Sequence, residues 1–320
     1  HAHRGIFVIN ELPDLQARIQ VALFNILQEG DIQIRGYNLR LPLDVQFVFT
    51  ANPEDYTNRG SIVTPLKDRI ESQIITHYPK DIETSARITR QEAKKIEDQE
   101  NRIVIFDEAL RLIEQTAHEA RHSEYVDEKS GVSARLTITA LENLKSSIER
   151  RSLKYNEKTA YVRFADFVGI IPAITGKIEL VYEGEQEGAS NVARKLIGKA
   201  IRALFHEYFP NPKNKKSSSY DRILHWFSDG NMLELFHDMS SKEYQNVLKD
   251  VDGLEELVKQ HITGLTSKNK FFFMEFALHG LAEYSLLSKH RIDEGNTFKD
   301  LLSGMINMDD ENNDEEDSFI

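Results

Sequence analysis

Two apolar runs near the start of the chain each lead to side chains that could act on a ligand. The run at 6–9 is followed by Asn10 and Glu11, and the largely apolar run at 45–49 leads to Asn52. Such runs are typical of strands in a parallel sheet, whose carboxyl ends meet at one edge. An amide at that edge could orient a water molecule or contact a phosphate. The alternative is a pair of strands that simply end in polar turn residues.

Residues 4–11 resemble the Walker B element of nucleoside triphosphatases. In that element an apolar strand delivers two acidic groups to the carboxyl edge of a sheet. The resemblance implies that residue 10 faces the water shell of a magnesium ion. It also implies that Glu11 polarises the water molecule that attacks the nucleotide. Asn10 and Glu11 are therefore the candidate magnesium site, with contact through water, and Glu11 is a candidate catalytic residue.

Two further segments contain an arginine that could act on a ligand. Residues 66–70 read Leu-Lys-Asp-Arg-Ile and contain Arg69, and residues 130–135 read Ser-Gly-Val-Ser-Ala-Arg and end at Arg135. Each segment is weak evidence alone, because an Asp-Arg sequence is also an ordinary surface pair. The evidence for a functional role is the order and spacing of these segments after the two strand ends.

Four segments in this order resemble the AAA+ ATPases of the magnesium chelatase and MoxR group. They are residues 4–11, 50–53, 65–70 and 130–135, with a hairpin inserted at 31–43. The resemblance spans roughly residues 4–183. It implies an α/β fold followed by an all-α region: the C-terminal part of a parallel-sheet AAA+ core, a helical lid and a helical C-terminal extension. It also implies ATP and magnesium as cofactors.

The resemblance assigns roles to the remaining polar residues. Asn52 corresponds to sensor 1 and Arg135 to a sensor 2 arginine that opens a lid helix. Together with Asn10 and Glu11 they would bind the nucleotide, and both are candidate catalytic residues. The alternative for Arg135 is an ordinary exposed arginine on a helix.

Arg69 corresponds to an arginine finger. Such a guanidinium completes the γ-phosphate site of the neighbouring subunit and stabilises charge in the transition state. Action in trans requires a head-to-tail ring, which in this family is a hexamer. The alternative is a local ion pair of Arg69 with Asp68 or Glu71.

The sequence departs from the family pattern at two places. Residue 10 is Asn where the family usually has Asp, which removes a charge worth roughly a few kcal/mol at about 4–5 Å and predicts weakened metal affinity. No G-x-x-x-x-G-K-[ST] phosphate-binding loop occurs, since Gly176-Lys177 is followed by Ile178. Because the chain starts at His1, inside a strand pattern, we expect that loop to lie upstream in a longer protein.

A second motif, His118-Glu119-Ala120-Arg121-His122, matches the zinc pattern H-E-x-x-H. The apolar stripe of this helix consists of Phe106, Leu110, Ile113, Ala117 and Ala120. That stripe predicts that both histidines face the solvent. A third ligand is also missing from the expected positions, so the sequence does not favour a zinc protease.

Periodicity predicts how these segments are positioned. In the first part it predicts a strand at 6–9, a helix at 12–27 capped by Gly30, a hairpin at 31–43 with its turn at 36–38, a strand at 45–50, a short helix at 65–70 and a strand at 74–75. Later helices are predicted at 88–98, 103–122, 136–150, 164–178 interrupted at Pro172, 192–208, 220–227, 232–237, 244–261 and 271–287. We expect a partial AAA+ core at 1–79, a lid at 80–183, an extension at 184–308 and an acidic tail at 309–320.

Composition excludes several classes of protein. The chain has 320 residues, 40% of them hydrophobic and 29% charged, which is typical of globular chains. It has no cysteine, which rules out disulfides and thiolate sites and favours a reducing, cytoplasmic location. Of the net charge of −12, the tail supplies −7 and the remainder −5. We therefore expect neither a membrane span nor a nucleic-acid partner.

The sequence thus predicts a segment of an ATPase that couples ATP hydrolysis to remodelling of, or metal insertion into, a partner. A regulatory or scaffold module of the same fold that does not hydrolyse ATP is the alternative, favoured by Asn10 and the missing phosphate-binding loop. The client, and whether any tetrapyrrole is involved, cannot be inferred from the residues.

Overall fold

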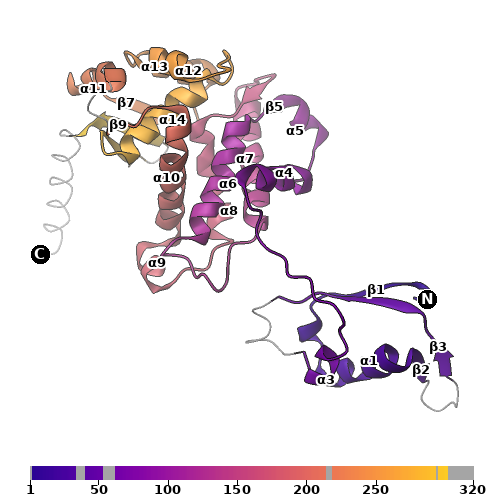
Figure 1. Ribbon diagram of the computed structural model, residues 1–320. Coiled ribbons are helices and arrows are strands. Elements are labelled where there is room, and N and C mark those ends of the chain that lie inside the picture. Colours follow the sequence, from indigo (N-terminus) through magenta and orange to yellow (C-terminus); the bar gives the residue numbers. More distant parts are fainter. Residues whose placement is uncertain (1, 34–39, 53–61, 214–217, 293–294, 302–320) are drawn as a thin grey trace, which may run out of the picture. The chain divides into compact units, whose positions relative to one another are not determined.

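The computed structural model describes residues 2–33, 40–52, 62–213, 218–292 and 295–301 (Figure 1). The chain divides into two compact units, residues 1–78 and 79–320. Each unit is described by itself below.

A parallel pair of strands forms the centre of the first unit. Strand β1 (Gly5–Ile9) pairs with β4 (Val45–Phe49) in a register that sets Phe7 opposite Phe47. The ladder continues past both strands, since the amide of Thr50 donates to the Ile9 carbonyl at 3.0 Å. The predicted strands and their parallel arrangement are confirmed.

Helix α1 (Ala17–Glu29) connects β1 to a hairpin in this unit. The helix ends at Gly30, whose φ of 62° is the left-handed conformation that closes a helix without steric cost in glycine. Strands β2 (Asp31–Gln33) and β3 (Arg40–Pro42) then pair antiparallel, which confirms the hairpin. Its predicted turn at 36–38 lies outside the described residues.

The end of the first unit contains a short helix but no further strand in its described part. Helix α3 (Thr64–Lys67) begins with Pro65 in its first turn and buries Leu66 completely, as predicted for this segment. The predicted strand at 74–75 is wrong. Ile74 is 91% exposed, and residues 71–79 form no ladder. Two apolar residues without a pairing partner do not make a strand.

Helices dominate the second unit, and one hydrophobic core runs through it. Helix α10 packs against α6 and α14, and α7 packs against the 3-10 helix η2. The helices are α4 (Ile82–Glu92), α5 (Glu97–Arg102), α6 (Asp107–Arg121), α7 (Arg135–Lys154), η2 (Phe164–Ile170), α8 (Ile171–Thr175), α9 (Tyr182–Glu187), α10 (Ala189–Tyr208), η3 (Ser218–Tyr220), α11 (Asp221–Ser228), α12 (Ser241–Lys249), α13 (Leu254–His261) and α14 (Lys270–Glu283). The core contains residues from both 80–183 and 184–308.

Helix α14 is apolar on nearly every side because it lies in the middle of this core. Phe273, Leu278 and Leu281 are all buried. The helix has 14 residues. Across the described ranges, no helix has the length and apolarity needed to cross a membrane.

Several helix boundaries differ from those that the periodicity of the sequence predicted. Residues 103–104 form strand β5 (Ile103–Val104), which pairs parallel with β6 (Ala160–Tyr161), so α6 starts only at Asp107. Pro172 does not interrupt a helix but lies in the first turn of α8, where a proline costs no hydrogen bond. Gly253, with φ of 79°, separates α12 from α13.

A small antiparallel sheet in the second unit was missed by the periodicity. Strands β7 (Leu233–Phe236), β9 (Gly295–Asp300) and β8 (Leu287–Ile292) lie side by side in that order. The helix predicted at 232–237 is wrong. Leu233 and Leu235 are buried while Glu234 is exposed, which is the two-residue period of a strand.

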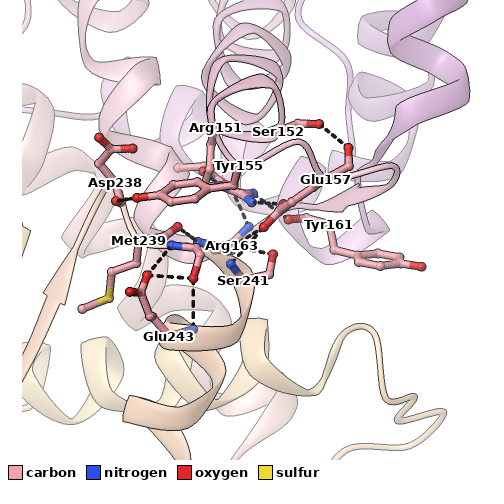
Figure 2. Close-up of polar contacts among 12 residues, drawn as sticks. Arg151, Ser152, Tyr155, Glu157, Tyr161, Arg163, Asp238, Met239, Ser241 and Glu243 are labelled. Atoms are coloured by element: carbon pink, nitrogen blue, oxygen red, sulfur yellow. Dashed lines mark hydrogen bonds and ion pairs between the residues drawn. The ribbon is translucent and has the colours of Figure 1, made fainter.

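A buried ionic network joins residues of the predicted lid to residues of the predicted extension (Figure 2). Arg151 contacts both Asp166, at 3.0 Å, and Glu157, at 3.0 Å. The other carboxylate oxygen of Glu157 accepts from the Ser241 amide at 2.9 Å. Arg163 donates to the Ser241 hydroxyl at 2.6 Å. Every charge is paired, so we interpret this cluster as a fixed structural contact.

Candidate functional site

The ends of β1 and β4 bring three polar residues together. Thr50 follows β4, and its hydroxyl donates to the side-chain oxygen of Asn10 at 3.3 Å. The same hydroxyl accepts a hydrogen bond from the backbone amide of Glu11 at 3.0 Å. Thr50 therefore fixes the strand end that carries both predicted magnesium-site residues.

The backbone of Glu11 adopts an uncommon conformation. Its φ and ψ are both 53°, in the left-handed region that few residues other than glycine occupy. The chain turns there into the 3-10 helix η1 (Leu12–Asp14). The Leu12 amide donates a hydrogen bond to the Thr50 carbonyl at 2.9 Å. The Glu11 carboxylate is exposed and makes no hydrogen bond or ion pair with a described side chain. It is therefore accessible to a ligand.

Asn52 lies three residues beyond the end of β4 and is exposed. Its position in the chain puts it past the same carboxyl end as Thr50. Residues 53–61, which include Pro53 of the predicted sensor segment, lie outside the described residues.

Arg69 is held by groups of its own unit. Its guanidinium donates to the side-chain oxygen of Gln28 at 2.6 Å and to the carbonyl of Pro65 at 2.6 Å. It also lies over the ring of Phe24, 5.2 Å from the centroid. All three partners are neutral, and no ion pair with a carboxylate of the described residues involves Arg69. These neutral groups thus orient the guanidinium without offsetting its positive charge.

Arg135 belongs to the second unit and is the first residue of α7. It is exposed, and its backbone amide donates to the Ser133 hydroxyl at 3.3 Å. The structure confirms that a helix begins at this arginine, as a lid helix would. Asn10, Glu11 and Asn52, by contrast, belong to the first unit.

Sequence reasoning missed two residues that position the candidates. Thr50 was part of the predicted sensor segment, but its link to Asn10 and Glu11 depends on the parallel register, which the residue pattern alone does not specify. Gln28 lies on α1, 41 positions before Arg69, and nothing local distinguishes it from other polar helix residues.

The two histidines of the H-E-x-x-H motif lie at the C-terminal end of α6. His118 and His122 are exposed on α6, as the apolar stripe predicted, while Leu110 and Ile113 are buried. The His122 ring contacts the His118 carbonyl at 2.8 Å. Burial and the neighbouring His122 lower the pKa of His118. Within the described part of the chain, no three His, Cys, Asp or Glu residues lie close enough to hold a metal ion.

The residues at the strand edge provide some, but not all, of the groups that would bind a nucleotide with Mg²⁺. Glu11 offers an accessible carboxylate, and Asn10 and Asn52 offer neutral amides suited to water-mediated contact. A single carboxylate gives the edge less negative charge than two would. Residues 1–320 contain no G-x-x-x-x-G-K-[ST] loop for the phosphates.

Comparison with known proteins relates the first unit to a known family of domains. Residues 1–75 match the family model of the Sigma-54 interaction domain, an AAA+ domain. No curated protein sequence matches the chain. Among solved structures, a protein assigned as an ATPase from Cytophaga hutchinsonii ATCC 33406 is 20% identical, with a TM-score of 0.23, over 62% of this chain and 64% of its own. The expected AAA+ resemblance is confirmed for residues 1–75.

Proposed function

We propose that the chain belongs to an AAA+ ATPase of the magnesium chelatase and MoxR kind, which uses ATP hydrolysis to remodel, or insert metal into, a partner. The observation that carries the proposal is the Thr50 bridge. It joins the ends of two parallel strands and holds Asn10 and Glu11 at one edge, with the Glu11 carboxylate open. Catalysis of phosphoryl transfer depends on such positioning.

Each residue of the edge has a separate task in this proposal. Glu11 polarises the attacking water, and Asn10 faces the water shell of magnesium. Asn52 orients the water or contacts the γ-phosphate. Bound Mg²⁺ would neutralise charge that develops on the phosphates. Asn10 weakens metal affinity because an amide contributes no formal charge.

Arg69 acts in trans in this proposal, as a finger toward the next subunit of a hexameric ring. Its neutral partners support this role, because a guanidinium already paired with a carboxylate would have less charge to offer a phosphate. Gln28 and Phe24 restrict its motion, which reduces the entropy lost on reaching the phosphate.

The helical unit supplies the lid and the extension. Residues 80–183 form the lid, with Arg135 sensing the nucleotide of its own subunit at the start of α7. Residues 184–308 form the extension. The hydrogen bonds that Glu157 and Arg163 make to Ser241 support movement of these two parts together, because separating them would leave polar atoms of buried charged groups without these partners. We place the assembly in the cytoplasm.

One specific observation favours a second candidate for the client. The family model that matches residues 1–75 is that of the Sigma-54 interaction domain. A sigma-54 protein as partner is the corresponding function. Under the scaffold alternative, the same strand edge would bind nucleotide without turnover, and Asn10 in the place of an acidic residue favours it.

Complementation between two inactive variants tests the proposal. In an assembly competent for ATP hydrolysis, Arg69→Ala and Glu11→Gln should each lower phosphate release at least a hundredfold. Mixing the two under conditions of subunit exchange should restore part of the activity, since each variant supplies what its neighbour lacks. Arg18→Ala is the matched control, because this exposed arginine of α1 is not part of the edge.

Two results would count against the proposal. If the mixture stays inactive although native mass measurement shows exchange, Arg69 does not act in trans. If Glu11→Gln turns over ATP as the parent does, Glu11 does not polarise the attacking water. If the parent binds ATP without any turnover, the scaffold alternative is the better explanation.

A further inference from the structure

A cavity in the second unit has no place in the proposed ATPase function. It has a volume of about 170 Å³ and lies where α10 faces η2, α14 and the β8–β9 strands. Four positions of α10 line it, Arg194, Ile197, Gly198 and Ile201, and their spacing puts them on one face of the helix. Phe164 and Phe167 add to its apolar wall.

The cavity is positively charged. Arg194, Lys289 and Arg291 line it, and Lys289 pairs with Glu283 at 3.1 Å. Neither arginine forms an ion pair with a carboxylate of the described residues. Burial, and secondly the charge of Arg291, lower the pKa of Arg194. The half-buried Arg194 therefore lies near the like charge of the exposed Arg291, an arrangement that a bound anion would stabilise.

Several buried polar atoms at the cavity have no hydrogen-bond partner among the described residues. They are Arg194 Nε, His237 Nδ1 and both ring nitrogens of His279. His279 is 5% exposed; its ring stacks on Phe164, with centroids 4.2 Å apart. The nearest carboxylate oxygen, Glu275 Oε1, is 3.6 Å from Nε2. Buried polar groups without partners are rare, and here they gather around one cavity.

We propose that this cavity binds a small anion carrying carboxylate or phosphate groups, held by Arg194 and Arg291, with the ring of His279 as a further contact. Water could satisfy the lone polar atoms but would not neutralise two guanidiniums. Arginine is well suited to both anion classes, because its planar fork matches their oxygens. The volume has room for about five or six water-sized groups, which suits phosphate or succinate.

The site is independent of the strand edge at Asn10 and Glu11. Its lining residues come from both the predicted lid (Phe164, Phe167) and the predicted extension (Arg194, Arg291). A bound anion would therefore strengthen the contact between these two segments of the second unit.

Titration calorimetry of the full chain tests the proposal, with sodium phosphate and sodium succinate as separate probes in a buffer low in chloride. We expect saturable binding of at least one probe with one site per chain. Arg194→Gln and Arg291→Gln should each weaken it at least tenfold, because each removes a charge-assisted hydrogen bond. Arg150→Gln is the matched control: it removes one exposed arginine that does not line the cavity, and affinity should stay within twofold.

His279→Phe separates a ligand contact from a structural role. Phenylalanine keeps the stacking on Phe164 but has no ring nitrogens, so binding should weaken at least threefold without a lower melting temperature. Three outcomes would overturn the proposal: no binding of either probe at millimolar concentration, binding by both arginine variants within twofold of the parent, or an equal loss in Arg150→Gln. Binding of only one probe supports the proposal and identifies the anion class.

Discussion

The two units divide chemistry and stability between them. The first unit holds Asn10, Glu11 and Asn52 at the ends of a parallel pair of strands whose apolar side chains are poorly covered: Ile6 is 70% exposed and Phe7 is 43% exposed. In the second unit the large apolar side chains of α14 are buried; Phe273, for example, is 1% exposed. Parallel sheets are normally covered on both faces. The first unit thus presents its strands for further contacts, whereas the second buries its own core.

This contrast indicates where the free energy of folding comes from. Buried apolar area stabilises a fold by about 25 cal/mol per Å², so an exposed strand contributes little. Apart from Leu12 and Leu66, the described part of the first unit buries few large side chains. We therefore expect the second unit to supply most of the stability of the chain.

The largest expected effect comes from removing matched aromatic side chains from the two units. Phe273→Ala should lower the free energy of unfolding by about 3–5 kcal/mol, because it leaves a cavity in a packed core. Phe7→Ala should lower it by less than about 1 kcal/mol. Urea unfolding followed by fluorescence suits this comparison, since the single tryptophan, Trp226, lies in α11 of the second unit.

Equal losses in the two variants would break the comparison. They would mean that Phe7 is covered in solution and that the first unit unfolds together with the second. An unchanged midpoint for Phe273→Ala would show that the core relaxes around α14.

A smaller effect concerns pH and a buried carboxyl group of the second unit. Burial raises the pKa of Glu275 to about 7, while hydrogen bonds from Tyr244 and the Ala165 amide oppose the rise. The folded-state pKa therefore lies above the unfolded value. The stability from this group is complete below about pH 4.5 and is lost as the pH rises through about 7. The loss amounts to roughly 3 kcal/mol.

Glu275→Gln should remove this pH dependence. The variant should match the parent near pH 4.5 and exceed its stability by up to roughly 3 kcal/mol at pH 8, because an amide does not ionise. Its NH₂ group could also donate to the neutral ring of His279, 3.6 Å from Glu275 Oε1. Urea midpoints at several pH values give the difference curve, with Glu11→Gln on the exposed edge as control. A flat difference between pH 4.5 and 8 would show that Glu275 ionises normally.

The two units also differ in how well the sequence predicted them. Strands β1 and β4, helix α1 and its cap at Gly30 follow from local apolar runs and one glycine, and all were predicted. Strand β7 was predicted as a helix, because six residues are too few to separate a period of 2 from one of 3.6. Its partner β9, which also pairs with β8, lies more than 50 residues later, so this pairing is a tertiary contact that the local pattern does not contain.

The candidate site shows the same limit. Asn10, Glu11 and Asn52 were predicted from strand ends, but the Thr50 bridge and the contact between Gln28 and Arg69 depend on residues about 40 positions apart. The cavity around Arg194 and His279 was not predicted. It combines elements from five parts of the chain, none of which has a distinctive local pattern.

The smallest expected effect tests the Thr50 bridge, the polar link between the two strand ends of the weakly packed unit. Thr50→Val keeps the shape of the side chain but removes the acceptor for the Glu11 amide and the donor to Asn10. Because the edge is exposed, water replaces both bonds and the cost should be about 0.5–1 kcal/mol, confined to the first unit. Hydrogen exchange on the full chain should then show faster exchange at Glu11, while the amides of α14 keep their protection. Thr50→Ser retains the hydroxyl and should exchange as the parent does. Equal exchange at Glu11 in all three proteins would mean that the β1 ladder, and not Thr50, orders the edge, so that the position of Glu11 would depend on backbone pairing alone.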